Sequence, residues 1–316
     1  MRCVRRLSFP GRAMAYSFQL PEPVSGGIRR MAGEQVEEAL DNLVRPVEDP
    51  DEALHDTRKR FKKVRALLRL VRKELGPDVY SRENREYRDL GRLLSPVRKS
   101  AVLSGTVAMV AEGVDGVLRD RAFHRFRSRL DERHEEILDD VLCPGGPVDR
   151  VREEGREARE RIASWTLEDR GFETMKASLH MVYKRGRNRM EDAYADPTGP
   201  RYHEWRKRVK YLWYHNRILA PVWNQVLDAR AHALHELADL LGDGNDLTDL
   251  LVLLDEEPHL APSDGIREAL AGLAERRRGL LWEVARPLGL KIYQETPDEF
   301  VDRMEGYWEV GVPEAG

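Results

Sequence analysis

The sequence predicts an all-α fold built from two related halves, and three observations support this. Hydrophobic residues recur with helical periodicity along most of the chain, and no segment shows a convincing alternating strand pattern. Charged residues make up 34% of the chain and aromatic residues 7%, which suits long helices with solvated outer faces. Two blocks of similar sequence recur at nearly the same offset, which indicates an internal duplication.

The first half is predicted to contain five helices. Residues 31–45 place apolar side chains on one stripe and acids outside it, and Pro46 ends this helix. Gly76-Pro77 ends the next helix, and Ser95-Pro96 separates the third from the fourth. The segment from Cys143 to Pro147 is the clearest break in the chain, and we take it as the boundary between halves. The expected helices are 31–45, 51–75, 82–94, 97–112 and 115–141.

The second half repeats this organisation. Asp243 to Thr248 superficially resembles a calcium loop, but Leu247 stands where an oxygen ligand is required. A helix boundary with Asp246 near the N-cap is therefore favoured. Trp205, Trp213 and Trp223 are expected to anchor the core. The expected helices are 148–165, 170–194, 200–219, 222–242, 245–256 and 263–286, with a short docked helix in the tail.

These elements give a domain organisation in four parts. We expect an N-terminal extension over 1–27, a first helical repeat over 28–142, a second over 148–290 and a C-terminal tail over 291–316. The basic N-terminus lacks the apolar region of a signal peptide, and Met14 is an alternative start to Met1. Cys3 and Cys143 are the only cysteines, which fits a reducing cytoplasm. No apolar run approaches the roughly 18–20 residues of a membrane span, so no membrane partner is expected.

The charge of the chain is distributed unevenly. The formal net charge is −3, yet residues 55–73 hold nine Lys or Arg against one acid. Residues 184–211 hold nine Lys or Arg against four acids. Net charge alone predicts no polyanion partner, whereas these two basic segments predict one.

The two basic segments contain the same motif. His55-Asp-Thr-Arg-Lys-Arg-Phe-Lys62 aligns with His203-Glu-Trp-Arg-Lys-Arg-Val-Lys210, with five of eight positions identical. On a helix, the positions i, i+3, i+4 and i+7 share one face, so each motif presents a histidine and three cations on one stripe. A single stripe of this kind is usually a solvated face, but its repetition favours two stripes that face a shared cleft and attract a polyanion.

This repeated motif resembles the signature of the CHAD domain, the conserved histidine α-helical domain. The segments Tyr183-Lys-Arg-Gly-Arg187, His235 to Gly242 and the aromatic tail are also similar to the family, so the resemblance covers roughly residues 28–310. One departure is Arg98-Lys99, where the family more typically shows Arg-Asp. The chain has no Glu-x-Glu-x-Lys strand of the neighbouring CYTH domain, which predicts a stand-alone form.

The resemblance implies two four-helix bundles related by a pseudo-twofold axis, with a basic groove or pore between them that binds inorganic polyphosphate. No cofactor, metal or catalytic residue is expected, and the protein is expected in the cytoplasm or on polyphosphate granules. The expected polyphosphate-binding residues are His55, Arg58, Lys59, Lys62, Arg65, Lys184, Arg185, Arg187, His203, Arg206, Lys207 and Lys210.

Several alternatives stay open at this point. The protein could be a phosphohydrolase or a phosphoryl-accepting enzyme acting on polyphosphate, or a nucleic-acid-binding protein, although its overall acidity disfavours nucleic acid. His55 and His203 could contact phosphate, more strongly when protonated, or could be buried imidazoles that bridge helices. His232, His235 and Asp239 could hold a metal, but an ordinary polar helix face is favoured.

Overall fold

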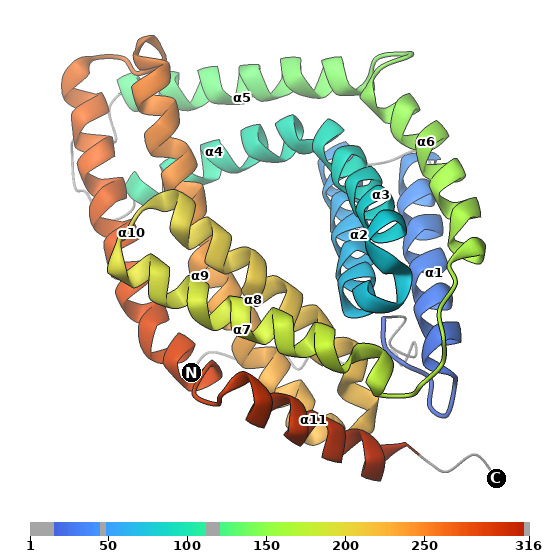
Figure 1. Ribbon diagram of the computed structural model, residues 1–316. Coiled ribbons are helices and arrows are strands. Elements are labelled where there is room, and N and C mark those ends of the chain that lie inside the picture. The colour runs from blue at the N-terminus through green and yellow to red at the C-terminus, as the bar shows by residue number, and fades with distance from the viewer. Residues whose placement is uncertain (1–15, 45–48, 112–120, 313–316) are drawn as a thin grey trace, which may run out of the picture.

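The computed structural model describes residues 16–44, 49–111 and 121–312, and over these ranges the fold is all-α (Figure 1). Within them the chain forms eleven α-helices, three short 3-10 turns and no strand, which confirms the predicted fold class. Met1, Cys3 and Met14 lie outside the described residues. The helices are α1 (Val24–Val44), α2 (Pro50–Leu70), α3 (Arg72–Leu93), α4 (Ser95–Ala111), α5 (Arg121–Leu142), α6 (Pro147–Arg161), α7 (Glu173–Ala195), α8 (Gly199–Leu219), α9 (Asn224–Glu256), α10 (Asp264–Ile292) and α11 (Pro297–Gly311).

The helices form two groups that share one large apolar core. In the first group α2 packs against α1 and α3, and α6 packs against both α1 and α3. In the second group α7, α8, α9 and α10 pack in succession, and α11 covers α7. The tail therefore contains the predicted helix, which begins with a capping box between Thr296 and Glu299.

Helices α4 and α5 reach from the first group to the second, across the top of Figure 1. Their apolar side chains meet the C-terminal part of α9 and the N-terminal part of α10 in a second core, which includes Val107, Phe126, Leu250 and Leu270. The two groups are thus joined through this second core and through the packing of α2 and α3 against α7 and α8.

The contact between α2 and α8 is closely packed. The fully buried imidazole of His215 on α8 lies 3.0 Å, Nε2 to O, from the carbonyl of Ala66 on α2. Tyr16 packs edge-on against Tyr214, with ring centroids 5.8 Å apart, and donates a hydrogen bond to the Lys63 carbonyl. Tyr16 lies in the segment expected as an N-terminal extension, and its side chain is part of the core.

Two expectations about the second half are wrong. Segments 222–242 and 245–256 form one continuous helix, α9, so Asp246 lies inside a helix and not near an N-cap. Gly242 and Gly244 lie inside α9, and each makes room for a side chain from another helix. A Cβ at Gly242 would lie 3.1 Å from Arg206 Nη2, and one at Gly244 would lie 2.8 Å from Trp282 Nε1. Trp223 is 45% exposed, whereas Trp205 is buried as expected.

The packing of α6 bears on where the repeats begin and end. Helix α6 lies in the segment expected to open the second repeat, but it packs against α1 and α3. Helix α11 follows α10 in chain order as α6 follows α5, and it packs against α7. We propose that the repeats run over 24–161 and 173–311, with the boundary after α6.

A buried carboxylate attaches α3 to α6. The side chain of Glu83 has no exposed surface, and its Oε1 lies 2.9 Å from Arg82 Nε and 3.2 Å from Arg161 Nε. Because Glu83→Ala leaves the buried end of Arg161 without this partner, we expect it to lower the free energy of unfolding by about 3–5 kcal/mol. Urea unfolding measures the loss.

Glu86→Ala is the matched control for this prediction. Glu86 also pairs with Arg161, at 3.5 Å, but its side chain is 28% exposed. Partly solvated pairs contribute about 1 kcal/mol or less, so the control should unfold close to wild type. Equal losses for the two variants would contradict the role given to Glu83.

Candidate functional site

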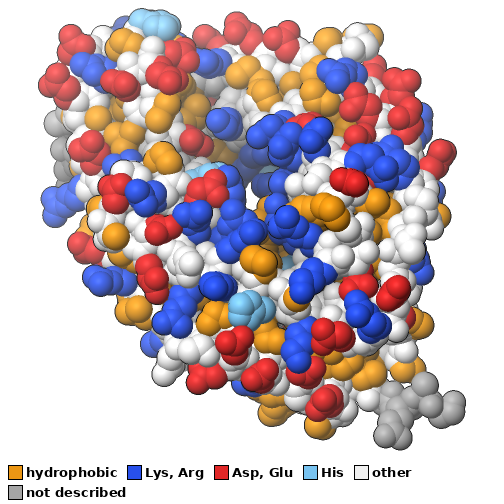
Figure 2. Space-filling model, viewed as in Figure 1, with side chains coloured by type: hydrophobic (Ala, Val, Ile, Leu, Met, Phe, Trp, Pro, Cys, Tyr) orange, Lys and Arg blue, Asp and Glu red, His pale blue; other side chains and the backbone are white. Residues whose placement is uncertain are grey.

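The candidate site is a group of five cations contributed by both halves, which we call the cation cluster. Arg58 and Lys62 lie on α2, Arg98 lies on α4, and Arg206 and Lys210 lie on α8. Electrostatic interaction couples Lys62 to the other four members. Figure 2 shows a hollow near the middle of one face of the molecule, with Lys and Arg side chains gathered around it.

Lys62 is at the centre of the cluster. Its side chain is exposed to solvent, yet burial by the surrounding protein, together with repulsion from Arg58, Arg206, Lys210 and Arg98, lowers its pKa to about 7. Among the described residues, no acid within 4 Å pairs with Lys62.

Two arginines of the cluster are held by backbone carbonyls. Arg58 Nη1 donates to the Gly91 carbonyl at 2.5 Å and to Ser95 Oγ. Arg206 Nε donates to the Ala238 carbonyl at 3.2 Å, alongside Gly242. Each guanidinium is thus fixed against the neighbouring helix of its own half, and neither forms an ion pair among the described residues.

Lys210 extends the cluster toward an aromatic surface. Its Nζ lies 3.8 Å from the ring centroid of Trp213, a distance at which a cation is attracted by the ring face. Burial lowers the pKa of Lys210 to about 8, and Arg206 adds to this effect while Asp239 opposes it.

The other lysine of each motif is neutralised. Lys59 Nζ lies 2.7 Å from Asp56 Oδ1, and Lys207 pairs with Glu204. Asp56 and Glu204 occupy the same position of the repeated motif. The motif therefore supplies a counter-ion to its first lysine, whereas its second lysine forms no ion pair within the described ranges.

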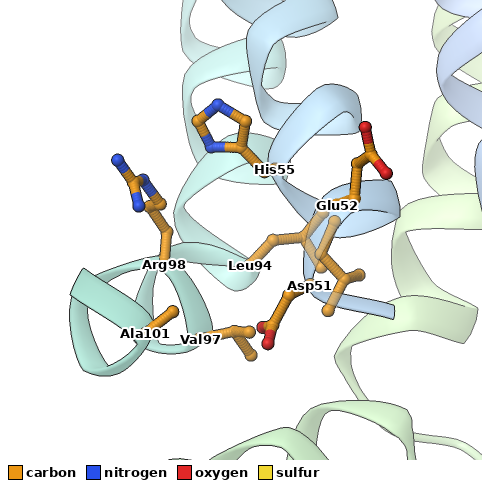
Figure 3. Close-up of a pocket in the computed structure, with 8 residues that line it drawn as sticks. Asp51, Glu52, His55, Leu94, Val97, Arg98 and Ala101 are labelled. Carbon is orange, nitrogen blue, oxygen red and sulfur yellow. The ribbon is translucent and has the colours of Figure 1, made fainter. Parts of the chain in front are cut away.

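The two histidines have lowered pKa values. His55 lines a cavity of about 200 Å³ with Arg98, and in Figure 3 its ring and the Arg98 guanidinium lie on the same side of that cavity. Burial, followed by repulsion from Arg98, lowers the pKa of His55 to about 4. Burial also lowers the pKa of His203, whose Nδ1 lies 2.5 Å from Asn245 Oδ1. In the free protein both rings are therefore shifted toward their neutral form.

The remaining predicted residues lie apart from the cation cluster or have partners. Arg65 Nε donates to Asn84 Oδ1 at 3.1 Å, and the charged groups that act most strongly on it include Tyr211 and Arg69. Arg187 donates to the Glu295 carbonyl and pairs with Glu191. Lys184 and Arg185 are exposed on α7.

The expected binding residues did not include Arg98. In the sequence, Arg98 is the arginine of the expected Arg-Asp pair and the departure lies at Lys99, so the motif comparison did not single out Arg98. Arg98 is exposed and has no ion pair among the described residues. It also interacts electrostatically with Asp246 from the other half, a partly buried carboxylate whose pKa is raised by burial while Arg206 and Arg98 oppose the rise.

The histidine and acid pattern on α9 forms a local pair. His235 Nδ1 lies 2.6 Å from Asp239 Oδ2, and the His235 ring packs edge-on against Trp213. Across the part of the chain that the structure describes, no three His, Cys, Asp or Glu side chains are grouped so that they could hold a metal ion. Over the same residues, no helix combines the length and apolar character needed to cross a membrane.

The fold and the cation cluster define an all-α protein in which two groups of helices bring cations together. A family model for the CHAD domain matches residues 30–255, and the chain therefore belongs to the CHAD family. The chain is also similar to the crystal structure of the CHAD domain from the plant Ricinus communis, with a TM-score of 0.61 and 19% identity over 96% of this chain and 97% of that one. No curated protein matches the chain.

The lowered pKa of Lys62 predicts a specific pH dependence of stability. The pKa of about 7 in the folded chain lies below the ordinary value of 10.5, so the charged amine destabilises the folded state fully below pH 7. This penalty is relieved as the pH rises from 7 toward 10.5. Lys62→Met should therefore raise Tm by a few degrees at pH 6, and by less at pH 9.

Lys291→Met is the matched control, because Lys291 is exposed on α10 and lies outside the cation cluster. Thermal unfolding followed by circular dichroism provides the measurement for all three proteins. A gain for Lys62→Met that is the same at both pH values would contradict the lowered pKa of Lys62.

Proposed function

We propose that the chain binds inorganic polyphosphate in the hollow of Figure 2, against the cation cluster. The observation that carries the proposal is the convergence of cations from α2, α4 and α8 around Lys62, with no acid paired to it among the described residues. The cations of the cluster repel one another until an anion binds among them. Because polyphosphate is a linear polyanion without bases, a protein can bind it through positive charge alone, with no groups that recognise a sequence.

The parts of the site differ in their proposed roles. Arg58 and Arg206 are fixed by carbonyls, so their remaining N–H groups are preorganised for phosphate oxygens. Lys62 and Lys210, which have no ion-pair partner among the described residues, add positive charge beside these two arginines. As secondary contacts we assign the partnered or more distant residues Lys59, Arg65, Lys184, Arg185, Arg187 and Lys207, with neutral His55 and His203 as hydrogen-bond donors.

The cross-helix geometry predicts a strong effect of a double substitution. Lys62→Gln with Arg206→Gln removes one cation from each half, and each lost charge-assisted contact costs about 1.5–3 kcal/mol. The affinity for long polyphosphate should fall on the order of 100-fold or more. Fluorescence titration at fixed salt measures it, after circular dichroism has shown that the variant folds.

The control is Lys291→Gln with Arg125→Gln, which removes the same number of charges from α10 and α5. It should bind like wild type. Equal weakening by both double variants would indicate that net charge matters and the cluster does not. Wild-type affinity should also rise with chain length and fall with salt, because many modest contacts add along one chain.

Two assays separate this function from its alternatives. Shortening of the chains on gels after incubation with Mg²⁺ or Mn²⁺ would indicate an enzyme. Displacement of polyphosphate by duplex DNA at physiological salt would indicate a nucleic-acid-binding protein. Binding without either outcome fits a non-catalytic module, which we place in the cytoplasm or on polyphosphate granules.

Binding should depend on pH through the lysines. The pKa values of Lys62 and Lys210, about 7 and about 8, are lowered in the free protein, and a polyanion favours the protonated amines. Affinity should therefore fall as the pH rises from 6 to 9, with proton uptake on binding near pH 7–8. Calorimetry in two buffers of different ionisation enthalpy measures the uptake; an affinity constant from pH 6 to 9 would contradict it.

A further inference from the structure

We propose that Lys62 is a site of acylation by small acyl phosphates, whose phosphate group is held by the surrounding arginines Arg58, Arg98 and Arg206. The site combines two features that such a reaction requires. One is an accessible amine that is not tied to a carboxylate, and the other is a set of anion-binding groups beside it.

The first feature is the state of the amine. Lys62 is exposed to solvent and has no paired acid among the described residues. The charged groups that act most strongly on it are cationic: Arg58 on its own helix, Arg98 on α4, and Arg206 and Lys210 on α8. At pH 7 an ordinary lysine is neutral in fewer than about one molecule in a thousand, whereas a pKa of about 7 leaves about half of the Lys62 amines neutral while the site holds no anion.

The second feature is the arrangement of the arginines. Arg58 and Lys62 are one turn apart on the same face of α2. Arg206 reaches the same amine from α8, and its Nε is fixed on the Ala238 carbonyl. A phosphate bound between these guanidiniums brings its acyl carbon next to the amine, so that binding and attack occur at one place.

The step balances without a further reactant. The nitrogen lone pair of the neutral amine forms a bond to the acyl carbon, and the bond from that carbon to the phosphate oxygen breaks. The phosphate leaves with the electron pair and takes the proton that the nitrogen loses. The products are an amide on Lys62 and inorganic phosphate.

Acylation would remove the charge at the centre of the cation cluster. This consequence rests on the proposed function, because it predicts weaker polyphosphate binding by the modified chain. The reactivity of the amine does not rest on it. Lys62→Gln reproduces the loss of charge, and Lys62→Arg keeps the charge while blocking the reaction.

The test compares two acyl donors on the folded, full-length protein. Acetyl phosphate and the acetyl ester of N-hydroxysuccinimide, which carries no phosphate, are each reacted at pH 7, and peptide mass spectrometry gives the initial rate at every lysine. With acetyl phosphate we expect Lys62 to react on the order of tenfold faster than exposed Lys291 on α10. This ratio should be smaller with the ester.

Arg98→Gln identifies the contribution of the phosphate contact. Arg98 is exposed and is not hydrogen-bonded among the described residues, so we expect the variant to fold, which circular dichroism checks. The variant should lose the preference for acetyl phosphate over the ester at Lys62. The same ratio of Lys62 to Lys291 for both donors in wild type would overturn the proposal.

Added polyphosphate separates the two hypotheses. Slower acetylation of Lys62 in its presence supports both. Fast acetylation that polyphosphate does not affect supports the acylation site and counts against polyphosphate binding at Lys62. Tight polyphosphate binding without preferential acetylation of Lys62 overturns the acylation site alone.

Discussion

Repulsion among like charges at the meeting of α2 and α8 is the constraint on which the rest of the structure depends. The cation cluster draws five cations from three helices, and repulsion from the other four adds to burial in lowering the pKa of Lys62. Such a group spreads apart unless other interactions fix the backbone beneath it. The fully buried contact of His215 with Ala66 lies at that place.

The scaffold resists this repulsion through two separate apolar cores. The larger core runs through both groups of helices and includes the α2–α8 contact. The smaller core joins α4 to α9 and α10, and α4 also carries Arg98. Because α4 is fixed at one end by this core and at the other by α2, Arg98 is brought to the cluster although it belongs to neither repeated motif.

Much of this arrangement could be predicted from the sequence, because periodicity and repetition are local signals. The stripe of Val64, Leu67 and Leu68 is buried on α2 as the helical pattern requires. The continuity of α9 could not be predicted, since the need for Gly242 and Gly244 arises from Arg206 and Trp282 on other helices. The neutral state of His55 could not be predicted from the sequence either, because it depends on burial of the ring and on the nearby charge of Arg98.

The two lysines of each motif show how the repulsion is limited. Asp56 and Glu204 neutralise Lys59 and Lys207 at the outer position, while Lys62 and Lys210 at the inner one form no ion pair with any residue that the structure describes. A site with every lysine paired would gain little from an anion, since each new contact would replace an existing one. A site with none paired would repel itself more strongly. Because Lys62 and Lys210 lie where both halves meet, an anion gains the most electrostatic free energy by binding there. The absence of a paired carboxylate within the described ranges also leaves the Lys62 amine available for the proposed acylation.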